Sequence, residues 1–348
     1  MKKNLFLAAV VSVVLAGCAK DPEAKVAADR ETIEVSYAGE VVTVKLEANY
    51  AWTAAVAGDV KVVVDPAQGT GNAEVTLKIE ENLGNSALEG TVTFSATGGG
   101  TTASTVIAIK QGVLTEVDYG GYKYKVKLLA DGNFWFVENL RFVPQGKEVS
   151  DDLSKLDNGI WYPVDHANKA LTDNADTIKV KGYLYSAEAA LGLAPHTVND
   201  DNFTTYSGAK GLCPDGWHIP TLDELANLVG RVAQSKYDLK QTPGPVASAP
   251  YWDATAGVAL ISKANADGFN IDNKVGYINA NATATQGTVL NVMNYILSST
   301  AVPKSTDAGV FNNQFYGILV ASTSGGSCNG ACFNYRGGAS VRCIKDYK

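Results

Sequence analysis

Basic clusters, histidine and cysteine are all scarce in this 348-residue sequence. Lys2-Lys3 is its longest basic run, and the net charge is -7. Nucleic-acid backbones are bound by clustered Lys and Arg, so we expect no nucleic-acid partner. The histidines are His166, His196 and His218. They are too scattered to predict a histidine-based zinc site or a catalytic triad.

Long apolar runs are also scarce, with one at the start of the chain. Leu5 to Gly17 is apolar but shorter than the roughly 20 residues of a spanning helix. It ends in "LAGC", Leu15 to Cys18, which resembles a bacterial lipobox. The resemblance implies a signal peptide over residues 1–17 and lipidation of Cys18. An ordinary secretory signal and an uncleaved anchor are the alternatives.

Lipid on Cys18 predicts that the mature chain is tethered to a membrane. Residues 18–30 are small or charged and lack periodicity, so we expect a flexible tether there. The acidic residues soon after Cys18 resemble the surface-export signal of Bacteroidetes lipoproteins. We therefore expect an outer-membrane lipoprotein exposed at the cell surface.

The stretch 31–112 alternates apolar and polar residues, as in Val42, Val44 and Leu46, with turn-forming segments between. This pattern predicts an all-β, immunoglobulin-like sandwich with Trp52 between its sheets. The segment resembles the BACON domain in Trp52, in "DPAQGTGN" around Pro66 and in the closing Gln111. That family is named for proposed carbohydrate binding. A single Trp in a core-like position favours a spacer instead.

Residues 117–348 mix helices with strands, which predicts an α+β domain. The region resembles the Fibrobacter succinogenes major paralogous domain, which looks C-type-lectin-like and, more distantly, related to formylglycine-generating enzymes. The motifs that carry the resemblance are "FWFVENL" (Phe134 to Leu140), "GYLYSAEAA" (Gly182 to Ala190), "CPDGWHIPTLDEL" (Cys213 to Leu225), "SST" (Ser298 to Thr300) and "SVRCIKD" (Ser340 to Asp346).

The stretch Gly211 to Gly230 is the one richest in reactive side chains. Thr221 and Glu224 have the spacing of a capping box, and Asp223 adds negative charge at the start of a predicted helix. No partner base lies at a spacing that demands catalysis, and His218 is more often a satisfied, partly buried group. We therefore interpret the stretch as structural and predict no catalytic residue.

Besides Cys18 the chain contains Cys213, Cys328, Cys332 and Cys343. An even number in an exported chain predicts disulfides, and three pairings exist. The family motifs imply Cys213–Cys343, with Cys328–Cys332 closing a tight loop.

An enzymatic alternative rests on Cys328 and Cys332, which look like the redox pair of formylglycine-generating enzymes. Their thiolates would suit copper, but their spacing is one residue too short. Acidic pairs such as Asp151-Asp152 and Asp200-Asp201 are able to bind calcium, although such pairs are usually solvated surface. We therefore predict neither a metal nor another cofactor.

Loop aromatics remain as candidate ligand-binding residues, because sugar recognition commonly uses an aromatic face. The candidates are Tyr251, Trp252 and Asp253 after a Pro-rich stretch, Trp161 and Tyr162 in "GIWYPVDHAN", and Phe203 and Tyr206. Core packing is the competing explanation for each ring. The sequence thus predicts a non-enzymatic envelope protein that binds extracellular glycan, such as mucin or polysaccharide. Protein–protein interaction, as an adhesin accessory, is the alternative.

Overall fold

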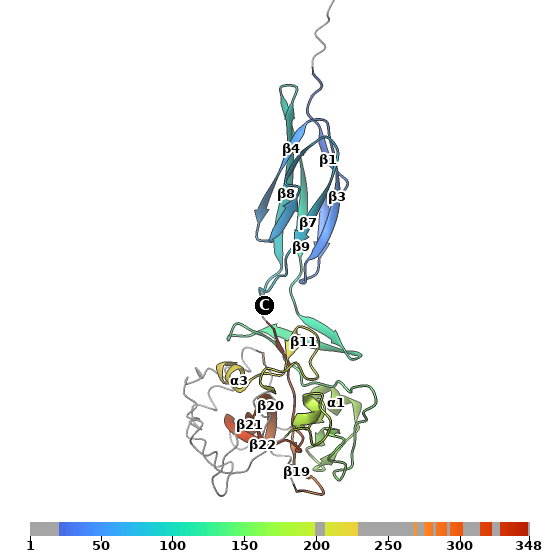
Figure 1. Cartoon of the computed structure of the whole chain (residues 1–348), viewed down its shortest axis with the longest axis vertical. Coiled ribbons are helices and arrows are strands. Elements are labelled where there is room, and N and C mark those ends of the chain that lie inside the picture. Colours follow the sequence, from blue (N-terminus) through green and yellow to red (C-terminus); the bar gives the residue numbers. More distant parts are fainter. Residues whose placement is uncertain are drawn as a thin grey trace, which may run out of the picture. The chain divides into compact units, whose positions relative to one another are not determined.

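The chain divides into two compact units, Met1–Val113 and Leu114–Lys348, in a computed structural model. The division falls close to the expected change of character between residues 112 and 117. The structure describes residues 21–198, 206–228, 268–269, 275–280, 283–290, 293–301, 314–321 and 328–346. Strands dominate both units, and helices are few and short (Figure 1). None of the helices within these ranges is both long and apolar enough to cross a membrane.

The first unit consists of two sheets. One has the order β1-β3-β7-β5 and the other β2-β9-β8-β4-β6. The strands are β1 (Val26–Ala28), β2 (Thr32–Val35), β3 (Glu40–Ala48), β4 (Ala51–Gly58), β5 (Val62–Asp65), β6 (Gln68–Thr70), β7 (Ala73–Ile79), β8 (Leu88–Gly98) and β9 (Thr101–Gln111). All pairs are antiparallel except β2 with β9.

Alternation along these strands produces the core of the first unit. Val44 and Leu46 on β3 are buried, while Lys45 between them is exposed. The predicted central tryptophan, Trp52, is 1% exposed and meets Phe94 edge to face at 5.8 Å. Its indole nitrogen donates to the carbonyl of Gly71 at 3.0 Å, so its one polar atom is satisfied.

The prediction of a flexible tether over residues 18–30 is wrong for its second half. Val26, Ala27 and Ala28 form β1, which pairs with β3, and Ala24 is buried. A three-residue edge strand of small side chains has no readable alternation. The strand β1 is defined by its backbone pairing with β3, and such pairing cannot be read from the pattern of side chains.

The second unit has shorter strands. Its five-stranded sheet has the order β10-β11-β12-β23-β17. The members are β10 (Glu116–Tyr119), β11 (Tyr122–Leu128), β12 (Phe134–Phe136), β17 (Trp217–His218) and β23 (Ile344–Lys345). A three-stranded sheet contains β20 (Met293–Ala301), β21 (Gln314–Ala321) and β22 (Cys328–Asn334).

Three strand pairs and three helices complete this unit in the described ranges. The pairs are β13 (Ile160–Trp161) with β16 (Leu184–Tyr185), β14 (Val164–Asp165) with β15 (Ala170–Leu171), and β18 (Tyr277–Asn279) with β19 (Thr288–Leu290). The helices are α1 (Ala175–Lys181), α2 (Ala187–Ala190) and α3 (Leu222–Leu228).

Local sequence signals explain several of these elements. Gly132, at a φ of 84°, allows the turn between β11 and β12, as its place in "DGN" predicts. The Ser186 side chain accepts from the Ala189 amide and caps α2. The sequence "YSAEAALG" predicts a short helix that starts at Ser186 and is stopped by Gly192. The helix α2 confirms this prediction, although it is a single turn.

Candidate functional site

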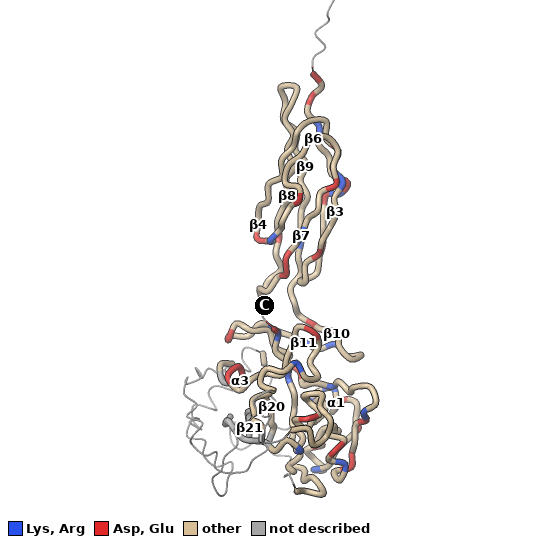
Figure 2. The backbone as a smooth tube through the Cα atoms, in the orientation of Figure 1, with Lys and Arg blue, Asp and Glu red and all other residues tan. Residues whose placement is uncertain are grey.

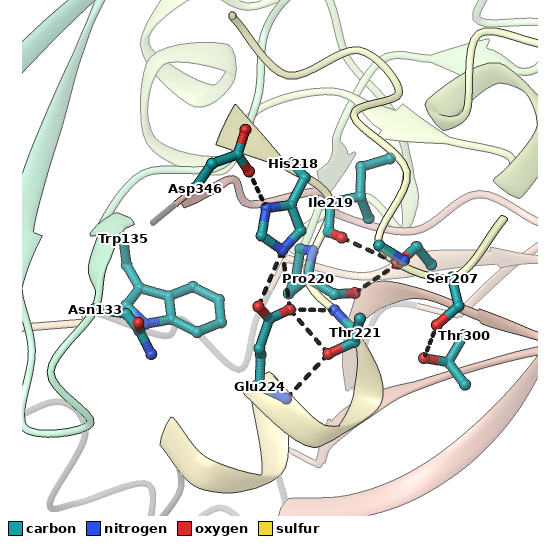
Figure 3. A network of polar contacts seen from close by, with 12 residues as sticks. Asn133, Trp135, Ser207, His218, Ile219, Pro220, Thr221, Glu224, Thr300 and Asp346 are labelled. Atoms are coloured by element: carbon teal, nitrogen blue, oxygen red, sulfur yellow. Dashed lines mark hydrogen bonds and ion pairs between the residues drawn. The ribbon is translucent and has the colours of Figure 1, made fainter. Parts of the chain in front are cut away.

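His218 lies at the centre of the polar network shown in Figure 3. It is the last residue of β17, and its ring lies between two carboxylates. The Nε2 atom is 3.0 Å from one Glu224 oxygen, and Nδ1 contacts Asp346. The imidazole side chain is 15% exposed, so solvent reaches only part of it.

Burial and charge oppose each other at His218. Burial alone lowers its pKa, but the Glu224 and Asp346 carboxylates together outweigh burial and raise the pKa above the usual histidine value. The same two effects change the pKa of Glu224 in the opposite direction. Its burial raises the pKa, yet bonds from His218 and Thr221 lower it overall. Together these shifts favour a charged ion pair near neutral pH.

Glu224 also forms the predicted capping box. Its carboxylate accepts from the Thr221 amide at 2.7 Å, and the Thr221 hydroxyl accepts from the Glu224 amide at 3.2 Å. The box places Glu224 on the first turn of α3, facing His218 (Figure 3). The sequence-based interpretation of these residues as the start of a helix is confirmed.

The same region is joined to the chain end by a covalent bond. Cys213 and Cys343 form the predicted disulfide, with an S–S distance of 2.05 Å. Next to it, β17 pairs with β23, and the Asp346 amide donates to the Gly216 carbonyl at 2.9 Å. His218, Glu224 and Asp346 therefore belong to a structural joint between α3 and the last strand. Their polar side-chain atoms contact one another across this joint.

The second predicted disulfide, Cys328–Cys332, does not fit the backbone. Both residues lie on the extended strand β22. Four residues of strand separate their Cα atoms by about 13 Å, and disulfides need less than about 7 Å. The sequence spacing suggested a tight loop because nothing in "CNGAC" marks the segment as a strand.

Trp161 was predicted to bind ligand, and this prediction is wrong. Its side chain is fully buried in an apolar cluster with Leu156, Val164, Leu184 and Ile278. Tyr162, the residue directly after β13, is half-buried. The ring of Tyr162 meets Tyr183 edge to face at 6.1 Å. Tyr206 is half-buried too, whereas Phe203 and the predicted Tyr251, Trp252 and Asp253 lie outside the described residues.

Tyr162 belongs to a group of half-buried rings that we call the tyrosine surface: Tyr119, Tyr122, Phe142 and Tyr162. Tyr119 and Phe142 lie 4.6 Å apart, and Tyr119 is opposite Tyr122 in the β10–β11 hairpin. These rings cover a fully buried layer that contains Tyr124 and Tyr185. In the sequence, Tyr119 and Tyr122 stand in "DYGGYKYK", and the hairpin that they form between β10 and β11 was not predicted. The aromatic content of that hairpin was the missed signal.

Arg141 lies behind the tyrosine surface and orders it. Its guanidinium carbon is 5.0 Å from the ring centre of Tyr122 and 4.9 Å from that of Tyr124. Its backbone amide donates to the Tyr124 hydroxyl at 2.8 Å. Arg141 is 5% exposed, so the cation fixes the rings from inside.

Burial raises the pKa of tyrosine hydroxyls within and beneath this surface. Burial raises the pKa of Tyr124 to about 12. Burial and the nearby Asp215 carboxylate raise the pKa of Tyr119. Burial, with a hydrogen bond to Tyr122, also raises the pKa of Tyr183. The surface therefore offers apolar ring area together with hydroxyl groups.

Among the described residues, we find neither a basic patch nor a cluster of metal ligands. Figure 2 shows acidic and basic residues interspersed along both units, without a basic stripe among the residues it colours. The part of the chain that the structure describes contains no cluster of three His, Cys, Asp or Glu side chains able to hold a metal ion. Asp152, one of the paired acids, uses a side-chain oxygen to accept from the Ser154 amide at 2.8 Å.

Comparison with known families assigns the second unit. The profile of the Fibrobacter succinogenes major domain matches residues 130–345, which is more than half of the chain. The chain belongs to this family. The family resemblance expected from the five motifs is thus confirmed. The matched region includes the disulfide, His218, Glu224, Phe142 and Tyr162. Asp346 lies just beyond it, and the hairpin that carries Tyr119 and Tyr122 precedes it.

Similarity to solved structures is weak. A Bacteroides ovatus GH5 xyloglucanase in complex with a XXXG heptasaccharide is 22% identical, with a TM-score of 0.25; the match covers 28% of this chain and 21% of the enzyme. The C. elegans MSP family member WR4 is 12% identical, with a TM-score of 0.20, over 25% of this chain and 96% of that chain. The PapD-like domain 7 of human CEP192 is 10% identical, with a TM-score of 0.23, over 32% of this chain and 96% of that chain. No curated protein matches this chain.

Proposed function

We propose that this protein is a non-enzymatic, lipid-anchored protein of the outer membrane that binds extracellular glycans through its second unit. The tyrosine surface carries the proposal. Sugars bind proteins by placing their C–H faces on aromatic rings while hydroxyl groups hydrogen-bond around them. Tyr119, Tyr122 and Tyr162 offer half-buried rings and hydroxyl groups on the second unit.

Ordering of these rings before binding supports the proposal. Arg141 holds Tyr122 from behind, and Tyr183 contacts Tyr162 from the side. A ligand that stacks on fixed rings loses less conformational entropy than one that must order them. Mucin glycans and polysaccharides are the ligand class we propose, because their repeating rings match a surface of several aromatic faces.

We also propose the finer architecture of the two units. The first unit is a BACON-like, immunoglobulin-like sandwich that acts as a spacer, since its tryptophan is buried in its own core. The second unit is C-type-lectin-like. Lipidation of Cys18 places both outside the cell. We do not favour the oxidase alternative, because Cys328 and Cys332 lie at the first and fifth positions of the extended strand β22.

A glycan array probed with the chain tests this function. We expect Tyr122→Ala and Tyr162→Ala each to weaken binding to the retained glycans by about tenfold, equal to about 1.4 kcal/mol. Tyr122→Phe keeps the ring and loses at most about threefold, within the range of a single hydrogen bond. Tyr37→Ala, which removes a half-buried tyrosine of the first unit, is the matched control and leaves binding unchanged.

Two results would count against the proposal. Absence of glycan binding by the unmodified chain rejects the function itself. Glycan binding that survives both alanine variants rejects the tyrosine surface as the site. In that case Trp252→Ala tests the loop that was predicted from sequence.

A further inference from the structure

A cleft of about 700 Å³ opens in the second unit, away from the tyrosine surface. Two unbroken runs of residues line it, 169–171 and 286–289, together with Asp151 and Leu153. Its volume falls within the range of about 300–1,000 Å³ that is typical of ligand sites.

Consecutive lining shows that the cleft follows strand edges. Successive side chains on a strand point to opposite faces, so a cleft over a sheet face is lined by every second residue. Here Ala170 and Leu171 of β15 and Thr288 and Val289 of β19 contribute as consecutive residues, which places the cleft along the edges of these two strands. Lys169, Gln286 and Gly287 come from the segments that precede the strands. Each of these strands belongs to a two-stranded sheet, β15 with β14 and β19 with β18. Among the described residues, their outer edges therefore carry no further strand.

The cleft has an apolar floor and a charged rim. Leu153, Leu171 and Val289 are half-buried and pack on the cluster that contains Trp161. Asp151 and Lys169 at the rim are exposed and opposite in sign. The amide of Gly287 donates to the Leu153 carbonyl at 2.8 Å, which fixes the floor against the start of β19.

We propose that this cleft binds an extended peptide segment of another protein as an added strand between β15 and β19. Main-chain groups of such a segment would pair with the two edges, and its inward side chains would contact the three aliphatic residues of the floor. An exposed strand edge is a template for this pairing. The floor contains no aromatic ring, which disfavours sugar as the occupant. The proposal goes beyond glycan binding, and neither depends on the other.

An array of synthetic octapeptides with aliphatic residues at alternate positions supplies the probe. The best binder is then titrated by fluorescence anisotropy against the chain and two variants. Ala170→Trp places a large ring in the cleft from an exposed position and is expected to weaken binding by about tenfold. Ala167→Trp adds the same ring to an exposed position of the same hairpin outside the cleft, and is expected to leave binding unchanged.

Backbone chemistry gives the sharper test. N-methylation of alternate amides in the octapeptide removes donors without changing its side chains, and is expected to abolish binding. Hydrogen exchange should slow at 169–171 and 287–290 when the unmodified octapeptide is added. Three outcomes overturn the proposal: no octapeptide binds, binding survives both Ala170→Trp and N-methylation, or the chain dimerises through the cleft without binding any octapeptide.

Discussion

The two units are stabilised in different ways. The first contains long ladders, such as the eleven residue pairs between β8 and β9, around an apolar core. Its buried polar side chains, within the described residues, are Asn82 and Gln111. The second relies on strands as short as two residues, a disulfide and many more buried polar groups. These are Asn139, Arg141, Ser150, Ser186, Glu188, Asn294, Ser298, Ser299, Ser340 and Arg342.

This difference shows how a unit with little regular structure holds its loops in one conformation. Glu188 is 5% exposed, and its two oxygens accept from the His196 and Val198 amides at 3.0 and 2.8 Å. Such bonds hold loops that have no ladder of their own. A unit built in this way can present long connections while its frame stays fixed.

The largest expected effect is on the second unit alone. The disulfide joins residues separated by 130 positions. In the chain-entropy model, loss of such a link costs about 5 kcal/mol. We expect the double variant Cys213→Ala/Cys343→Ala to lose hydrogen-exchange protection throughout the second unit, whereas protection of the first unit stays unchanged. Equal loss in both units would contradict the distinction.

The corresponding variant destabilises the first unit. Trp52→Ala removes a fully buried ring and its bond to Gly71, at a cost of about 4 kcal/mol. Hydrogen exchange should quicken in the strands of the first unit and stay constant in the second. Glycan binding should persist, because we propose that the second unit binds the glycan and the first unit is a spacer. Loss of binding by a variant whose second unit stays protected would assign the site to the first unit.

Arg342 tests the buried polar groups. Its Nε donates to the Asn139 side chain at 2.7 Å, and its guanidinium lies 4.4 Å from the centre of the Phe269 ring. Arg342→Met leaves Asn139 without this donor and should lower the free energy of unfolding by about 3 kcal/mol. Chemical denaturation measures the change. Arg30→Met, which removes an exposed pair with Asp29 in the first unit, should change it by less than about 0.5 kcal/mol.

The smallest effect is pH-dependent. The pKa of His218 is raised in the folded state, so its contribution is present below the usual histidine value and is lost as pH rises through the folded value. The pKa of Glu224 is lowered, so its contribution is lost as pH falls through the folded value. The second unit should thus lose about 1 kcal/mol between weakly acidic and alkaline pH. His218→Gln should flatten this dependence in thermal melts, and an unchanged slope would contradict the ion pair.

Sequence reasoning recovered the first unit well because alternation reports burial directly. Val44, Leu46 and Trp52 were placed correctly, whereas β1 and the short strand β6 were missed. In the second unit it recovered what short-range chemistry dictates, namely the capping box and the helix at Ser186. It could not separate Trp161 from Tyr162. A two-residue strand is too short for alternation to show which ring faces the core, and that depends on which distant segments pack against it.

The tyrosine surface was missed for a related reason. Tyr119 and Tyr122 belong to a hairpin, Phe142 follows the next strand, and Tyr162 lies further along the chain. Their proximity results from tertiary packing around Arg141. No local pattern in the sequence encodes it.

Ring-labelled tyrosine NMR of the chain, with an array-selected glycan added, tests the central claim most directly. The account predicts shifts at Tyr119, Tyr122 and Tyr162, with Tyr37 and Tyr50 of the first unit unchanged. Shifts confined to the first unit, or a bound glycan that leaves all three second-unit rings unmoved, would contradict it.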